Sequence, residues 1–178
     1  MKSEKLITNI IDQIKEVQIK LGYVKETVRL YYPASSLNAI LGLEAKDEHE
    51  MVENLQGLFS HMDTELGELR AAVSGGRVEI SIPPEGAEYV HKKVESPAFL
   101  TDLITLFQTH HCCPIEDIRG IFEAHGRYRC EKMAEGTDFD YVMYFEDPSV
   151  DEYYYCIKAE MGHTIYHRFT KEDYEQLL

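Results

Sequence analysis

The sequence lacks any long hydrophobic run. Its first stretch, MKSEKLITNIIDQIKEVQ, is interrupted by Asp12, Lys15 and Glu16, which is the pattern of neither a signal peptide nor a transmembrane span. Cysteine is also scarce, with four in 178 residues and two of them adjacent, which disfavours a disulfide framework. We therefore expect a cytoplasmic protein with reduced thiols and no membrane partner.

Positive charge is in short supply. Lysine and arginine number 18 against 32 aspartates and glutamates, which leaves a net charge of −14. Such a surface repels phosphates and anionic membranes. Glycine-rich phosphate loops, dinucleotide fingerprints and nucleophile elbows are absent from the sequence as well. We expect no nucleic-acid partner, because an acidic chain meets protein or peptide partners more readily.

The residues that are present suit a folded chain. Hydrophobic residues make up 44% of the sequence, which is enough for a core, and the length fits one domain. We predict a single α+β domain over residues 1–178. A mostly helical part with a β-hairpin occupies about 1–95, and a helix pair with a four-stranded antiparallel meander occupies about 96–178.

Hydrophobic periodicity predicts the individual elements. Apolar residues at helical spacing, from Leu6 to Leu21, predict a helix over 4–21 with Ser3 as its N-cap. Similar signals predict a helix over 45–62 and one or two helical turns over 85–94, and Ser74-Gly75-Gly76 predicts the hairpin turn.

In the second half, Pro97 and Pro114 are expected at the first positions of two helices. Alternating residues then predict four strands, and Thr170 is expected to cap a final short helix. The predicted strands cover residues 127–133, 138–146, 152–161 and 163–169.

The stretch HHCCPIEDIRGIFEAHGRYRC, residues 110–130, is the one that resembles a reactive site. A metal could take His111 and Cys113 as ligands, but four consecutive residues cannot all converge on one ion. A helix over 114–125 would also place His125 about 15–18 Å from Cys113. We expect no metal and no cofactor here. We expect the histidines and cysteines to be ordinary residues of loops and of partly buried turns.

Two other functions for this stretch stay open. Cys113 could be a catalytic thiol at a helix N-terminus with His110 or His111 as its base, although Glu116 and Asp117 oppose a thiolate there. The helix pair followed by strands also fits a nucleic-acid-linked transcriptional regulator. The acidic start of the second helix disfavours contact with phosphate.

Tyrosine is abundant, with 12 residues, and several fall in the last strands. Alternation predicts that Phe139, Tyr141, Met143 and Phe145 face the helices. It predicts that Tyr144, Tyr154, Tyr166 and Arg168 form a binding surface on the opposite face, since tyrosine and arginine are enriched at interfaces. We expect that face to be covered, either by the helix over 4–21 or by a second molecule.

The segments CPIEDIRGIFEAHG, DFDYVMYFEDP, YYYCIKAE and YHRFTKEDY resemble a family of uncharacterised bacterial proteins. The resemblance implies a bacterial cytosolic protein and assigns no active-site residue.

These observations favour a non-catalytic module that binds a protein, a peptide or a second copy of itself. An enzyme that uses a thiol or metal around residues 110–130 is the alternative from another class, and the transcriptional regulator is the third.

Overall fold

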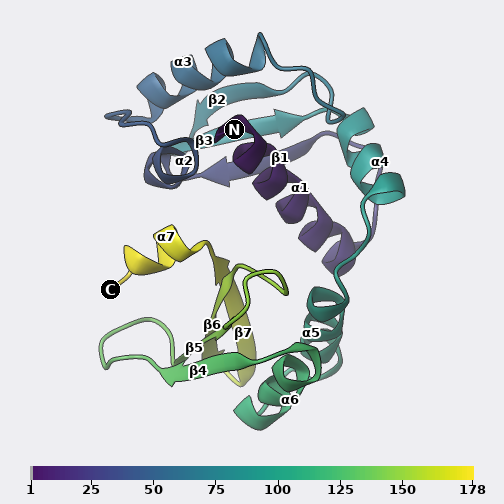
Figure 1. Cartoon of the computed structure of the whole chain (residues 1–178), viewed down its shortest axis with the longest axis vertical. Coiled ribbons are helices and arrows are strands. Elements are labelled where there is room, and N and C mark those ends of the chain that lie inside the picture. The colour runs from purple at the N-terminus through teal and green to yellow at the C-terminus, as the bar shows by residue number, and fades with distance from the viewer. Residues whose placement is uncertain (1) are drawn as a thin grey trace. The chain divides into compact units, whose positions relative to one another are not determined.

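The chain folds into two compact units that are joined at residues 96 and 97. The computed structural model describes residues 2–178, and its first unit ends at Ser96 while the second spans Pro97–Leu178. Over these residues the structure has seven helices and seven strands in two antiparallel sheets, which confirms the α+β class (Figure 1). The single-domain interpretation stays a prediction.

The first unit places a three-stranded sheet among four helices. Its strands lie in the order β1-β3-β2 and are all antiparallel. Its elements are α1 (Lys2–Leu21), β1 (Val28–Tyr32), α2 (Ala34–Leu41), α3 (Glu48–Phe59), β2 (Arg70–Ser74), β3 (Arg77–Ile82) and α4 (Pro84–Lys93).

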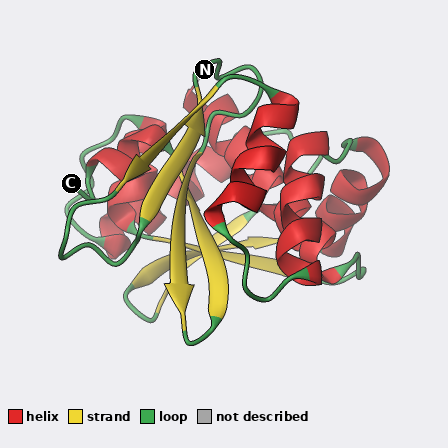
Figure 2. Ribbon diagram, turned by 90° about the horizontal axis from the view of Figure 1, so that it is seen from below, coloured by secondary structure: helices red, strands yellow, loops and turns green. Residues whose placement is uncertain are grey.

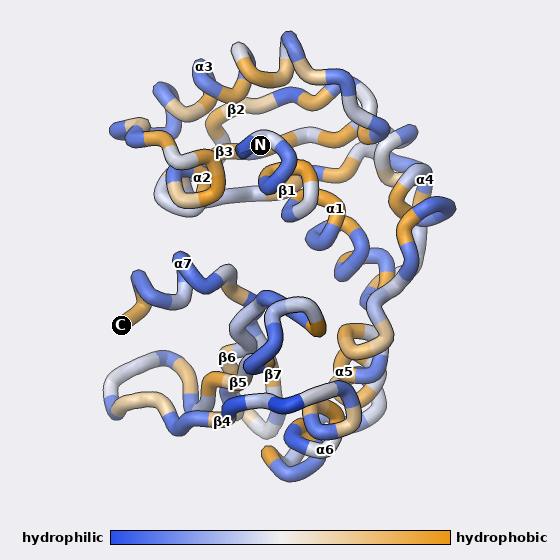
Figure 3. Tube along the Cα trace, viewed as in Figure 1, coloured by the Kyte–Doolittle hydropathy of each residue, from blue (hydrophilic) through white to orange (hydrophobic). Residues whose placement is uncertain are grey.

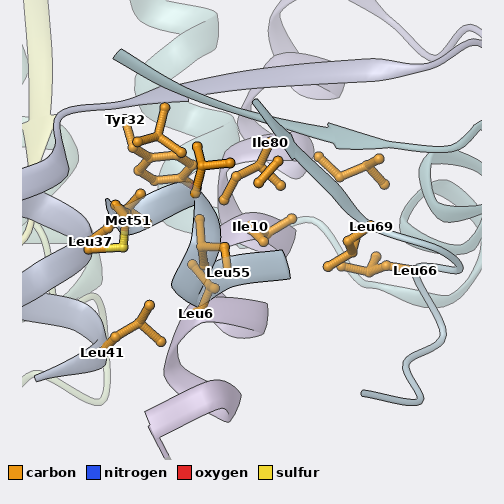
Figure 4. Close-up of a cluster of buried hydrophobic side chains, with 14 of the residues drawn as sticks. Leu6, Ile10, Tyr32, Leu37, Leu41, Met51, Leu55, Leu66, Leu69 and Ile80 are labelled. Carbon is orange, nitrogen blue, oxygen red and sulfur yellow. The ribbon is translucent and has the colours of Figure 1, made fainter. Parts of the chain in front are cut away.

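The apolar stripe of α1 is buried along only part of its length. Leu6, Ile10 and Ile14 are fully buried, whereas Leu21 at the C-terminal end is 82% exposed. Figure 4 shows Leu6 and Ile10 beside side chains from α2, α3 and β3 in the core of this unit. Hydrophobic and hydrophilic residues alternate along α1 with the helical period (Figure 3). The helix begins at Lys2, so the prediction that Ser3 is its N-cap is wrong.

The other elements of this unit follow the predicted pattern with shifted ends. The helix α3 is shorter than the predicted 45–62, because Asp47 caps it by accepting a hydrogen bond from the Glu50 backbone N–H. The helix α4 runs for ten residues, and the hairpin of β2 and β3 turns at Gly75 and Gly76, as predicted.

The second unit packs a helix pair on a four-stranded meander. The strand order β4-β5-β6-β7 confirms the predicted meander, and Figure 2 shows the strands in yellow and the helices in red. Its elements are α5 (Ala98–Thr109), α6 (Ile115–His125), β4 (Tyr128–Lys132), β5 (Tyr141–Phe145), β6 (Tyr154–Glu160), β7 (His163–Phe169) and α7 (Lys171–Glu175).

Aromatic rings join the helix pair to one face of this sheet. The Phe99 ring of α5 meets the rings of Phe122 and Phe145 at 4.7 Å each, and Tyr155 completes the group at 5.4 Å from Phe99. This face carries Met143, Phe145 and Tyr155, as the alternation predicts. We call it the inner face and the opposite one the outer face.

Phe139 departs from that alternation. Its ring lies 5.4 Å from His167 and 5.9 Å from Phe169, which places it at the outer face instead of the inner one. Phe139 precedes β5, so the regular alternation of the strand does not extend to it. Among residues 2–178, no helix combines the length and the apolar character that crossing a membrane requires.

Candidate functional site

Residues 110–113 form the loop between α5 and α6, and Cys113 is the buried residue of this loop. The Cys113 side chain is 6% exposed, and its thiol donates to the carbonyl oxygen of His110 at 3.0 Å. The N-cap of α6 is Pro114, so the prediction that Pro114 is the first helical residue is off by one, and Cys113 is not the cap. Pro97 likewise caps α5 from outside the helix.

This loop is held to the beginning of β7 by three hydrogen bonds. The Thr164 backbone N–H donates to the carbonyl oxygen of His111 at 2.8 Å. The Cys113 backbone N–H donates to Thr164 Oγ1 at 2.9 Å, and that hydroxyl donates to the carbonyl oxygen of Cys113 at 3.2 Å. The bonds use backbone groups and a threonine hydroxyl, so they tie the meander to the helix pair without using the thiol.

The chemistry of the thiol follows from its burial. Burial raises the pKa of Cys113, and the neighbouring Asp117 carboxylate raises it further. The protonated form therefore predominates near neutral pH, which does not suit a nucleophile. His110 and His111 are exposed, and no hydrogen bond joins either ring to the Cys113 sulfur within the described part of the chain.

His125 and Cys130, in the later part of the 110–130 stretch, have partners elsewhere. His125 Nε2 lies 2.7 Å from Asp102 Oδ2 across the helix pair, and Cys130 lies on β4, where its sulfur is 3.6 Å from the Arg119 guanidinium. Over residues 2–178, no group of three or more histidine, cysteine, aspartate or glutamate side chains is placed to hold a metal ion. The stretch is thus divided among separate places in the second unit.

The outer face of the second sheet carries a stack of three tyrosines. The Tyr144 and Tyr154 rings are 4.4 Å apart and inclined by 24°, and the Tyr174 ring of α7 lies 4.8 Å from Tyr154 at 16°. All three side chains are half-buried. The Tyr144 hydroxyl donates to Glu131 Oε1 at 3.0 Å, which connects this tyrosine stack to β4.

Tyr174 is the member that periodicity could not find, because it lies beyond the strands on a five-residue helix. Its presence shows that α7 supplies part of the cover for the outer face. Burial raises the pKa of Tyr144, as does the Glu131 carboxylate, so the phenol stays neutral near pH 7.

Two residues of the predicted surface lie on the other side of the sheet. Tyr166 pairs with Ile157 and its ring meets Phe107 of α5 at 5.2 Å, while Arg168 pairs with Tyr155 and lies over the Tyr153 ring at 4.3 Å. The prediction that they share a face with Tyr144 and Tyr154 is therefore wrong. The register of β7 carries both toward the helix pair.

The strand β4 forms one edge of the second sheet, and the direction of its backbone groups can be derived from its ladder. Glu146 N–H donates to Arg127 O and Met133 N–H donates to Asp140 O, both at 2.9 Å. An antiparallel ladder alternates with period two, so the backbone groups of Arg129 and Glu131 also face β5. Those of Tyr128, Cys130 and Lys132 point away from the sheet, and within residues 2–178 no strand pairs with them. We call these outward groups the β4 edge.

Comparison with known proteins identifies a family for the chain. A family model described as "Domain of unknown function, E. rectale Gene description (DUF3877)" matches residues 3–178. The chain belongs to the DUF3877 family. This confirms the resemblance to uncharacterised bacterial proteins that the sequence motifs suggest. No curated protein and no solved structure matches the chain.

The first unit of this DUF3877 chain also has a small pocket, of about 110 Å³. The C-terminal half of α1, including Val17 and Gln18, and the segment 22–28 contribute most of its walls, and Ala87 of α4 completes them. Gln18 donates from Nε2 to the Ala87 carbonyl oxygen at 2.9 Å, while its buried Oε1 has no hydrogen-bond partner within the described residues. The lining of the pocket is mostly apolar.

Proposed function

We propose that this member of the DUF3877 family is a non-catalytic module that binds a protein or a peptide in the cytoplasm. The binding surface is the outer face of the second sheet together with the β4 edge. The tyrosine stack is the observation that carries the proposal. It places three half-buried rings together on the outer face, two from the sheet and one from α7.

Tyrosine rings suit this role for a physical reason. Each ring offers a large apolar contact area and a polar hydroxyl, and it loses little conformational freedom on binding because it rotates about only two side-chain bonds. Stacking holds the Tyr144 and Tyr154 rings in place before a partner arrives, which lowers the entropy cost of binding.

Charged side chains surround the tyrosine stack. Arg129 and Glu146 form an ion pair at 2.8 Å on the same face, and Lys158 pairs with Glu160 at 3.2 Å. An aromatic centre with a polar rim is the arrangement of many protein interfaces. The open strand beside it adds backbone donors and acceptors that an extended segment could meet.

The enzyme alternative is less well supported by the geometry. The thiol form of this alternative requires a Cys113 thiolate, and burial favours the protonated thiol instead. The metal form requires ligands that converge, and no such group of three is found among residues 2–178.

Site-specific photo-crosslinking in cells tests the proposal. A benzophenone amino acid replaces Tyr144, and the matched control carries the same group at Tyr31, which is 49% exposed in the first unit. We expect a discrete adduct at position 144 and only diffuse background at position 31. Mass spectrometry then identifies the adduct, and binding is repeated with the purified partner.

An adduct pattern that is the same at both positions would contradict the proposed surface. So would a purified partner whose affinity is unchanged by Tyr154→Ser, because that substitution removes the central ring of the tyrosine stack.

A further inference from the structure

We infer that the partner at the β4 edge is a second copy of this chain, paired antiparallel through β4 about a two-fold axis at Cys130. The inference rests on the proposed function, since it names the occupant of the same surface. It is carried by the direction of the backbone groups of β4 and by the order of charges along the strand.

The backbone of β4 is suited to pairing with itself. Tyr128, Cys130 and Lys132 all present their N–H and C=O groups outward, as the ladder with β5 requires. With the axis at Cys130, Tyr128 lies opposite Lys132 of the second copy, and the two Cys130 residues face each other. Each such pair exchanges two hydrogen bonds, which gives about six across the junction.

The side chains between these positions are complementary. Arg129 and Glu131 both lie on the outer face and are both exposed. In this register Arg129 stands opposite Glu131 of the second copy, and the symmetry repeats the pair. Opposite charges directly across an antiparallel pair stabilise it, by about 0.2–1 kcal/mol each.

Neighbouring registers are disfavoured by the same two residues. Moving the axis to position 129 brings the two Arg129 side chains together, and moving it to position 131 brings the two Glu131 side chains together. Like charges directly opposite each other destabilise a strand pair. The charges that make β4 a poor partner for an apolar strand therefore select one self-pairing.

The opposite edge of the sheet is not equivalent. At β7, the Thr164 N–H points outward and already donates to the His111 carbonyl oxygen, so the 110–113 loop occupies the start of that edge. A two-fold pairing through β4 then uses one surface on both copies, which is the closed arrangement that homodimers adopt.

Cys130 provides a direct test, because residues at the centre of such a pair have Cα atoms about 5.5 Å apart, within the range that a disulfide spans. The full chain with Cys112→Ser, which removes the exposed cysteine of the 110–113 loop, is treated with diamide. We expect a covalent dimer of two 20.6 kDa chains. The matched control, which carries Cys130→Ser as well, should give none.

Charge reversal tests the register. The chain with R129E is acidic at both positions and the chain with E131R is basic at both. We expect each variant alone to dissociate about tenfold or more readily than the wild type in sedimentation velocity over a dilution series. An equimolar mixture of the two should recover the dimer, which two merely unfolded chains could not do.

Three results would overturn the inference. They are a chain that stays monomeric over the whole series, a diamide product that survives Cys130→Ser, and a dimer that R129E leaves unchanged. A monomer that still forms a discrete adduct with a different protein at position 144 would leave the proposed function intact. A Cys130-dependent dimer without any other partner would support both.

Discussion

Gly86 makes the tightest contact with backbone among the glycines of the first unit. It lies in the first turn of α4, where a Cβ atom would collide with the Leu66 carbonyl oxygen and come within 2.5 Å of Ile82 Cγ2. The Leu66 atom is backbone, so it cannot move aside as a flexible side chain would. A glycine here brings the helix close to the segment that precedes β2.

We expect Gly86→Ala to lower the free energy of unfolding by about 1–3 kcal/mol, because the added methyl group overpacks a rigid contact. The matched control is Gly57→Ala in α3, where nothing lies within 4 Å of the new Cβ. The control should stabilise the chain by up to about 1 kcal/mol, because alanine favours the helix. Thermal melting of both variants checks the prediction, which fails if the two changes have the same sign.

The four cysteines should differ sharply in reactivity. Cys112 is exposed, whereas Cys113 and Cys156 are buried, and burial raises the pKa of Cys156 to about 11. We expect iodoacetamide near neutral pH to modify Cys112 at least about tenfold faster than Cys113 or Cys156, because only the thiolate reacts. Peptide mass spectrometry over a time course measures the rates. Fast labelling of Cys113 would return the thiol-enzyme hypothesis to consideration.

The sequence predicts the sheet face of some tyrosines but not of others. The face of Tyr144 and Tyr154 follows from alternation within strands, and the structure has both rings on one side. The face of Tyr166 depends on the length of the turn before it. Met161 and Gly162 both have positive φ, 50° and 78°, and form a two-residue turn that pairs Glu160 with His163. That register places Tyr166 opposite Ile157, and a shift of one residue would have reversed its face.

Among the elements that carry the tyrosine stack, α7 is the least stable. It has five residues, which is too short to be stable as an isolated helix. Its N-cap is Thr170, as the sequence predicts, and Thr170 Oγ1 accepts from the Asp173 N–H at 3.2 Å. The cap therefore controls whether Tyr174 stays on Tyr154.

We expect Thr170→Ala to unfold α7 locally, because losing an N-cap costs about 1 kcal/mol. Amide hydrogen exchange should become faster over residues 171–178, and the near-ultraviolet circular dichroism of the tyrosines should weaken. Thr170→Ser keeps the hydroxyl and serves as the control. Unchanged exchange in the alanine variant would mean that packing alone holds the helix.

Element types are easier to predict from this sequence than element ends. The meander and the Gly75-Gly76 hairpin follow from short-range alternation and turn residues, and both are confirmed. The ends of α1 and α3 depend on burial and on which of several nearby residues forms the cap. In α3 that residue is Asp47. Outward backbone groups such as those of Cys130 depend on long-range register, which one strand does not reveal.

The whole molecule is dominated by acidic charge. With a net charge of −14, the surface opposes the approach of a polyanion over most of its extent. We expect duplex DNA at about 0.15 M salt to bind more weakly than about 0.1 mM, with no dependence on sequence. Gel-shift titration with two unrelated duplexes measures this. A sub-micromolar, sequence-dependent shift would favour the transcriptional regulator instead.

The hydrogen bond from Thr164 N–H to the His111 carbonyl oxygen also has a consequence for the polymerisation of the chain through its sheet edges. Polymer growth through sheets needs two accessible edges on every chain, one for the copy before and one for the copy after. The 110–113 loop occupies the beginning of β7, so growth through the second sheet that starts at β4 meets a partly covered strand at the opposite edge of that sheet. We therefore expect displacement of the 110–113 loop to expose the β7 edge and to favour edge-to-edge aggregation.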